Sequence, residues 1–120
     1  MITVLIVDDS ALSRKFLKKI VLKNGCEIVG EANNGKLGVE MYKKLSPDLV
    51  TMDLIMDEMD GLEALKLIME ENPSANVIMV SSIGQEVIVR DAIILGAKNF
   101  LLKPLDEEKV MRAISKIFMI

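Results

Sequence analysis

The sequence predicts an α/β fold in which five parallel strands form a single doubly wound sheet with five helices. Two observations favour this fold. Short apolar runs alternate strictly with segments of helical periodicity, which is the pattern of successive β-α units. The connections between them are short, and no linker, repeat or low-complexity stretch interrupts the alternation. We therefore expect residues 1–120 to form one domain, which is long enough to bury a hydrophobic core.

Five short apolar runs are the predicted strands. Each run is bounded by polar or turn-forming residues, and its continuous apolar character suits a strand that is buried on both faces of a parallel sheet. In chain order the predicted strands are Thr3–Val7, Glu27–Glu31, Leu49–Met52, Asn76–Val80 and Asn99–Leu102.

The first helix is predicted to run from Ser10 or Ala11 to Lys23. Ser10 is a suitable N-cap, and Asn24-Gly25 is a common way to end a helix. The apolar stripe at helical spacing consists of Phe16, Leu17, Ile20 and Val21. The basic residues of this helix are expected to form a solvated face rather than a nucleic-acid surface: Arg14, Lys15, Lys18, Lys19 and Lys23.

Four further helices fill the later intervals between strands. Proline or glycine follows three of them, and Asp106 is the expected N-cap of the last. The predicted ranges are Lys36–Leu45, Leu62–Glu71, Gln85–Leu95 and Asp106–Phe118.

Composition excludes several classes of function. The chain has 18 acidic and 15 basic residues and a net charge of −3, so nothing favours direct binding to nucleic acid. It has no histidine, which excludes histidine-based triads and imidazole metal ligands. Cys26 is the only cysteine, so no internal disulfide forms, and we expect it in the core or at its edge. No signal peptide or transmembrane-length apolar run is visible, so we expect a cytoplasmic protein with no membrane partner.

Polar residues follow four of the predicted strands where each strand ends. These are Asp8-Asp9, Asp53, Ser81-Ser82 and Lys103-Pro104. Because ligands bind at the carboxyl ends of parallel strands, we expect three carboxylates, two hydroxyls and a lysine to converge at one edge of the sheet. Each signal alone is more often a helix cap, a turn or a loop, but the four together favour a site.

The residue types at this edge suit cation and phosphate chemistry. Three clustered carboxylates are costly unless a cation neutralises them, and oxygen ligands of this kind suit Mg²⁺. Lys103 supplies a compact positive charge for a phosphoryl group, and the Ser81 hydroxyl can hydrogen-bond a phosphoryl oxygen. Asp53 is then the expected nucleophile, as in aspartyl-phosphate chemistry.

The same residues carry a resemblance to a known family. The motifs are Val4–Ser10, Met52–Met56, Met59–Gly61, Val80–Ser82, Gly96–Ala97 and Lys103-Pro104. Over essentially its whole length the chain resembles the receiver domains of bacterial two-component response regulators, and chemotaxis members in particular. The resemblance implies a flavodoxin-like sheet with the strand order 2-1-3-4-5.

The resemblance implies a role for each residue of the predicted metal and phosphate site. Asp53 resembles the phosphoacceptor. Asp8 and Asp9 resemble the Mg²⁺-binding acids, and Asp53 and the backbone carbonyl of Ile55 complete the ligand set. Lys103 resembles the lysine that contacts the phosphoryl group.

The resemblance also implies a switch. Ser81 resembles the hydroxyl residue that moves onto the phosphoryl group, and Phe100 resembles the aromatic residue that turns inward in the active state. Pro104 resembles the proline of a cis Lys-Pro bond.

In the family the surface formed by the fourth helix, the fifth strand and the fifth helix is the common output face, so an output protein is expected to bind there. Val89 and Ile93 are spaced away from their helix's main apolar stripe, and Phe100 and Leu102 lie nearby on the fifth predicted strand. These four residues suit an exposed apolar patch, and a wide buried face is an equal alternative.

The function implied is that of a stand-alone response regulator, with chemotaxis or motility as its expected pathway. A receiver of another two-component pathway, such as transcriptional control, is the alternative. A histidine kinase is the expected phosphodonor, and an output protein is the expected partner. We expect self-phosphorylation from small donors and slow self-dephosphorylation with a separate phosphatase, because Ile55 and Ile83 cannot orient water. No reaction on an external metabolite is expected.

Two other classes of function fit the sequence less well. A flavodoxin-like cofactor binder needs a phosphate cradle after the first strand, where this chain has Asp8-Asp9. A phosphorylation-independent scaffold would not need the intact acid, hydroxyl and lysine set.

One departure from the family pattern is Asp57, which replaces the usual proline. We favour a tolerated, solvent-facing loop change, with altered cation affinity or loop mobility as the alternative.

Overall fold

The computed structural model describes residues 1–120 and contains one five-stranded parallel sheet. The strand order is β2-β1-β3-β4-β5, as the family resemblance implied. The strands are β1 (Thr3–Val7), β2 (Glu27–Ala32), β3 (Leu49–Asp53), β4 (Val77–Ser81) and β5 (Asn99–Leu102). The helices are α1 (Ala11–Lys23), α2 (Gly35–Leu45), α3 (Gly61–Glu71), α4 (Glu86–Leu95) and α5 (Glu107–Phe118).

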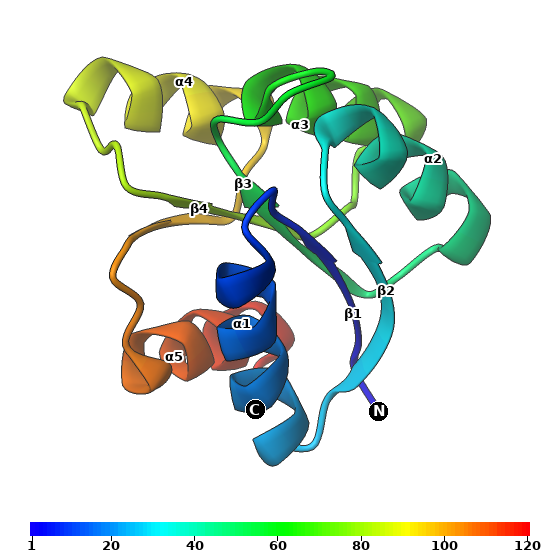
Figure 1. Cartoon of the computed structure of the whole chain (residues 1–120), viewed down its shortest axis with the longest axis vertical. Helices are drawn as coiled ribbons and strands as arrows, with labels where there is room; N and C mark the ends of the chain where they lie inside the picture. The colour runs from blue at the N-terminus through cyan, green and yellow to red at the C-terminus, as the bar shows by residue number, and fades with distance from the viewer.

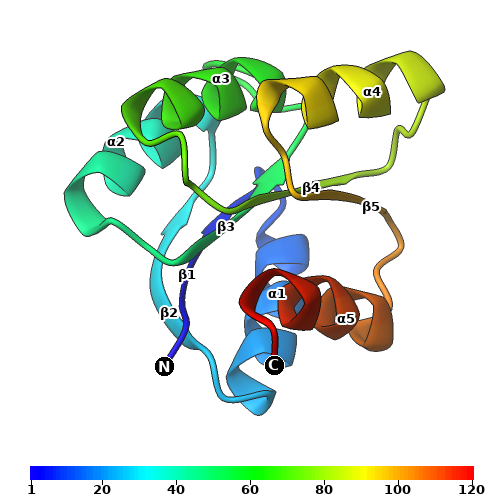
Figure 2. The same cartoon turned by 180° about the vertical axis from the view of Figure 1, so that it is seen from behind.

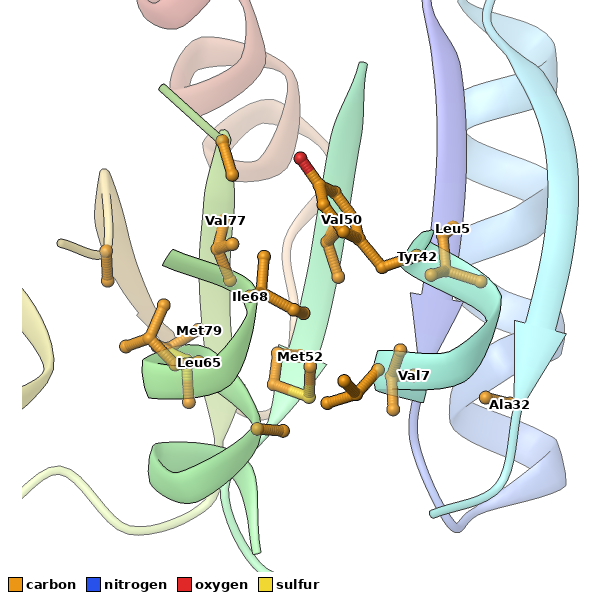
Figure 3. Packing of buried hydrophobic residues seen from close by; sticks show 14 of the residues in the cluster. Leu5, Val7, Ala32, Tyr42, Val50, Met52, Leu65, Ile68, Val77 and Met79 are labelled. Atoms are coloured by element: carbon orange, nitrogen blue, oxygen red, sulfur yellow. The ribbon is translucent and has the colours of Figure 1, made fainter. Parts of the chain in front are cut away.

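The helices cover both faces of the sheet, so the predicted doubly wound fold is confirmed. Helices α1 and α5 lie on one face, and α2, α3 and α4 lie on the other (Figure 1; Figure 2 shows the same layers from behind). Each layer of helices encloses its own hydrophobic cluster against the sheet. The larger cluster lies on the side of α2, α3 and α4, where Leu65 and Ile68 pack over Met52 and Met79 (Figure 3). None of the helices combines the length and the apolar character needed to span a bilayer.

Helices α2 and α3 begin one residue earlier than predicted because a side chain caps each of them, and α4 begins one residue later, at Glu86. The Asn34 side chain accepts a hydrogen bond from the backbone N–H of Leu37 at 2.8 Å, so α2 begins at Gly35. Asp60 caps α3 in the same way, and α3 begins at Gly61. A cap satisfies a backbone donor that the first turn leaves free, so it fixes the start of the helix. The predicted caps Ser10 and Asp106 are confirmed.

Four strand boundaries shift by one residue. Strands β2, β3 and β4 extend to Ala32, Asp53 and Ser81, and β4 begins at Val77 rather than at Asn76. Asp53 and Ser81 are therefore the last residues of adjacent strands, which brings their side chains to the same edge of the sheet.

Phe16 is not part of the buried stripe of α1. Leu17, Ile20 and Val21 are buried as predicted, but the Phe16 side chain is 42% exposed. A helix of this length buries a stripe on one side, and Phe16 lies at the edge of that stripe, beside the loop that follows β5. Cys26 is buried, as predicted.

Thr51 provides a test of packing in the central strand. Its side chain is 2% exposed, its neighbours across the sheet are Ile6 and Ile78, and its hydroxyl has no hydrogen-bond partner. A buried hydroxyl without a partner costs about 1 kcal/mol or more, so Thr51→Val is expected to raise the free energy of unfolding by about 1 kcal/mol. Urea unfolding measures this change. Thr3→Val is the control, because the Thr3 hydroxyl hydrogen-bonds Asp48 and its loss should lower stability.

Candidate functional site

Three carboxylates meet at the carboxyl edge of the sheet. Asp8 directly follows β1, Asp9 is the next residue, and Asp53 ends the adjacent strand β3. Their carboxylate oxygens lie within 4.8 Å of one another. Asp8 and Asp53 are 1% and 7% exposed, whereas Asp9 is exposed to solvent. The predicted convergence of these acids is therefore confirmed, with one carboxylate on the solvent side of the cluster.

Lys103 reaches the cluster from the end of β5. Its ammonium group lies 2.9 Å from Asp8 Oδ2 and 3.8 Å from Asp53 Oδ2. One ammonium group faces three carboxylates, so the cluster keeps an excess of negative charge. The peptide bond between Lys103 and Pro104 is cis, as the resemblance implied.

The environment of Asp53 disfavours its charged form. The pKa of Asp53 is raised to about 6. Burial is the largest cause, the nearby Asp8 carboxylate is the next, and Asp9 raises the pKa least. The ammonium group of Lys103 and the backbone N–H of Leu54, which donates to Asp53 Oδ1 at 2.9 Å, act in the opposite direction. A perturbed carboxyl group at the edge of a parallel sheet is typical of a functional site.

The donor set fits a hard divalent cation. All three side chains offer carboxylate oxygens, two of them are nearly buried, and their negative charge exceeds that of the single lysine. Mg²⁺ binds such carboxylates together with water, and the solvent-facing Asp9 leaves room for water ligands. The Ile55 carbonyl belongs to the loop after β3, and its role as a ligand stays a prediction.

The two predicted hydroxyls have different environments. Ser81 ends β4 beside Asp53, is 1% exposed, and its hydroxyl accepts a hydrogen bond from the backbone N–H of Ile83 at 3.1 Å. Ser82, the next residue, is exposed, and its part in the site stays a prediction.

The α4 and β5 surface exposes a different set of apolar residues from the one predicted. Ile93 is exposed, but Val89 and Phe100 are half-buried, and Phe100 packs against the larger core cluster. The exposed set consists of Val87, Ile93, Ile94 and Leu102, and Ile94 is 74% exposed. Val87 and Ile94 were missed, although their seven-residue separation places them on one side of a helix. We call these four residues the α4-β5 patch.

Sequence reasoning also missed how two basic residues of α1 are used. Arg14 and Lys18 were expected to be solvated, but both form ion pairs with Glu31 of β2, at 3.3 Å and 2.9 Å. Arg14 Nη1 in addition donates to the backbone carbonyl of Asp8 at 2.7 Å. Only the three-dimensional pairing of α1 with β2 reveals these contacts, because the residues are far apart in the sequence.

Comparison with known proteins settles the family. The model of the response regulator receiver domain matches residues 4–115. The chain belongs to this family. The receiver domain is 49% identical over 114 residues to the chemotaxis protein CheY of Thermotoga maritima, covering 95% of each chain. It is 52% identical over 113 residues to CheY of Bacillus subtilis, covering 94% of each.

A solved structure shows the same fold in detail. The receiver domain matches a chain of the CheX-CheY-BeF₃-Mg²⁺ complex from Borrelia burgdorferi with a TM-score of 0.96 and 42% sequence identity. The match covers 98% of this chain and 89% of that chain. This protein is therefore a CheY-like receiver domain, which belongs to two-component signalling.

Asp9 offers a test of metal binding. Asp9→Asn removes a hard anionic oxygen from the cluster, so Mg²⁺ affinity is expected to fall by about tenfold. NMR titration of the metal-free protein, following the amides of residues 8–10, measures the dissociation constant. Asp57 is exposed and lies outside the cluster, so Asp57→Asn is the control. An unchanged affinity in Asp9→Asn would mean that Asp9 is only part of the helix start.

Proposed function

We propose that this protein is a response regulator of chemotaxis or motility signalling, switched by Mg²⁺-dependent phosphorylation of Asp53. One observation carries the proposal: the Asp53 carboxylate lies nearly buried among Asp8, Asp9 and Lys103 at the edge of the sheet. The identity to CheY proteins of two bacteria supports the pathway. The chain has no histidine, so a separate histidine kinase, or a small donor such as acetyl phosphate, supplies the phosphoryl group.

The residues of the site divide the chemistry among them. An Asp53 carboxylate oxygen attacks the phosphorus atom, and the bond to the donor breaks. Asp8 and Asp9, with the Ile55 carbonyl and Asp53 itself, would hold Mg²⁺, and the bound cation would neutralise charge on the phosphoryl oxygens. Lys103, whose ammonium group lies 3.8 Å from Asp53 Oδ2, would pair with a phosphoryl oxygen. These roles follow from the donor types and from the family.

The switch follows from what the new phosphoryl group attracts. Its oxygens accept hydrogen bonds, and the buried Ser81 hydroxyl at the end of β4 is the nearest candidate donor on the adjacent strand. Movement of Ser81 and of the loop after β4 frees space for Phe100, which turns inward from its half-buried position. The α4-β5 patch, together with α5, then forms the surface that an output protein binds.

Two measurements test this function. The wild-type protein, incubated with acetyl phosphate and Mg²⁺, is expected to gain one acid-stable, base-labile phosphoryl group that peptide mapping places on Asp53. Proteins captured from a cell extract are expected to differ with and without beryllofluoride, a mimic of the phosphoryl group. Failure to take up phosphate in the presence of Mg²⁺ would overturn the proposal.

Lys103 and Ser81 are expected to couple phosphorylation to the output face. Lys103→Ala and Ser81→Ala should still accept a phosphoryl group at a measurable rate. When two sites are coupled, occupation of one typically changes the affinity of the other by about 5-fold to 150-fold. In both variants we expect the coupling between the phosphoryl site and the output face to shrink to about twofold or less. NMR shifts of Val89, Ile93 and Phe100 on adding beryllofluoride and Mg²⁺ provide the readout.

A matched control and a contradicting outcome make that experiment decisive. Lys98→Ala removes an exposed lysine outside the acidic cluster and should leave the shifts intact. If the shifts persist in full in both Lys103→Ala and Ser81→Ala, the coupling runs through other residues.

A further inference from the structure

Four polar groups of Asp8 are held by four different parts of the fold. Its backbone N–H donates to the Ala32 carbonyl of β2 at 3.0 Å. Its Oδ1 accepts from the backbone N–H of Ser10, and its Oδ2 accepts from Lys103, each at 2.9 Å. Its carbonyl oxygen accepts from Arg14 Nη1 at 2.7 Å. The position of this buried carboxylate therefore depends on its backbone as well as on its side-chain partners.

Arg14 is itself fixed by a second contact. Its Nε lies 3.3 Å from Glu31 Oε1, and its side chain is only 20% exposed. Lys18 binds the other oxygen of Glu31 at 2.9 Å, and the hydrogen bond from Lys18 lowers the pKa of Glu31 more than the contacts from Arg14 do. Glu31 stays charged, and it holds a planar guanidinium group that can donate in two directions at once.

We propose that Arg14 is a positioning residue that orients the Asp8-Asp9 turn for cation binding. The guanidinium group joins the carbonyl of Asp8 to the Glu31 carboxylate of β2, so the first turn of α1, the end of β1 and β2 are linked at the edge of the site. This inference rests on the proposed function, because it concerns the acids that are assigned there to the metal. Arg14 acts through Asp8 and does not touch the phosphoacceptor.

Positioning and charge predict opposite effects of removing Arg14. The guanidinium group is a cation close to a cation site, so its charge alone disfavours Mg²⁺, and Arg14→Met would tighten binding if charge were all that mattered. If Arg14 positions Asp8, the same substitution weakens binding. Loss of a partner that holds a metal ligand typically costs tenfold or more in affinity, and we expect about a tenfold weaker dissociation constant for Mg²⁺.

Lys18→Met is the matched control. Lys18 lies on the same helix, carries the same charge and pairs with the same carboxylate, but it makes no contact with Asp8. Both variants lose a Glu31 partner, so urea unfolding should show similar small losses of stability. We expect Lys18→Met to change the Mg²⁺ dissociation constant by no more than about twofold, because an ion pair on the surface is screened.

The decisive experiment uses the full chain in two conditions. In the metal-free protein, amide hydrogen exchange at Ser10 should speed up in Arg14→Met and not in Lys18→Met, because the Ser10 N–H depends on the position of Asp8 Oδ1. Titration with MgCl₂, followed by NMR, should then show the weaker affinity only in Arg14→Met. Equal behaviour of the two variants in both measurements, or tighter Mg²⁺ binding by Arg14→Met, would overturn the inference. A wild-type protein that binds no Mg²⁺ would refute the proposed function, and the hydrogen-exchange comparison would still decide the role of Arg14.

Discussion

Replacement of Asp53 by Asn is expected to abolish phosphoryl uptake while making the metal-free protein more stable at pH 7. The amide is not a competent nucleophile, so no phosphoryl group should be detected by intact mass after incubation with acetyl phosphate and Mg²⁺. The gain in stability has a separate cause. The charged Asp53 carboxylate is buried beside Asp8, and a neutral amide of the same shape removes that cost.

The pH dependence of stability follows from the pKa of Asp53. Burial raises this pKa from 3.8 to about 6 in the folded protein, so the folded state binds more protons than the unfolded state between these values. The contribution of Asp53 to stability is therefore expected to fall as the pH rises from about 4 to about 6, and its full cost is present above pH 6. Glu31, whose pKa is lowered, contributes with the opposite sign near pH 4, and this contribution cancels when Asp53→Asn is compared with the wild type. The shift of the Asp53 pKa corresponds to at most about 3 kcal/mol, which Asp53→Asn should largely recover at pH 7.

Urea unfolding at pH 4 and at pH 7 checks the stability of Asp53→Asn. The variant and the wild type should be similar at pH 4 and differ at pH 7 in the absence of Mg²⁺. Adding Mg²⁺ should stabilise the wild type more than the variant, because the variant has lost an anionic ligand. Asp57→Asn, which makes the same chemical change in an exposed loop, should alter neither phosphoryl uptake nor the pH dependence. Labelling of Asp53→Asn at the level of the wild type would refute the site assignment.

The sequence predicted the convergence of the acids because topology alone requires it. Asp8 follows β1 and Asp53 ends β3, and parallel neighbouring strands must end at the same edge. Lys103 could be placed for the same reason. The exact partners inside the cluster could not be predicted, since the 2.9 Å contact of Lys103 with Asp8 rather than with Asp53 depends on side-chain packing.

Properties that depend on the rotation of a helix were harder to predict. Arg14 and Phe16 lie on the first two turns of α1, and the sequence suggested a solvated arginine and a buried phenylalanine. In the structure Arg14 binds Asp8 and Glu31, whereas Phe16 is partly exposed. A shift of one residue turns a side chain by about 100° around the helix axis, so small differences in docking exchange buried and exposed positions.

Gly61→Ala is expected to damage both the fold and the site, because the start of α3 is pressed against the end of β3. The backbone N–H of Gly61 donates to the Leu54 carbonyl at 2.7 Å. A Cβ atom at position 61 would overlap the Asp53 carbonyl oxygen and lie 2.8 Å from the Leu54 Cα. Both are backbone atoms, so no side-chain rotation relieves the overlap, and α3 must move away from the strand that carries Asp53.

We expect Gly61→Ala to lower the free energy of unfolding by about 3 kcal/mol, the upper part of the usual range for overpacking. Gly25→Ala is the control for the general cost of replacing glycine. Gly25 has a φ of +86° and open space around it, so its substitution should cost about 1 kcal/mol through backbone strain alone. Phosphoryl uptake is measured without urea, at a temperature at which both variants are folded. It should fall only in Gly61→Ala, because only that substitution displaces the Asp53 backbone. Equal losses of stability in the two variants, with uptake intact in both, would show that the loop between β3 and α3 yields without moving the site.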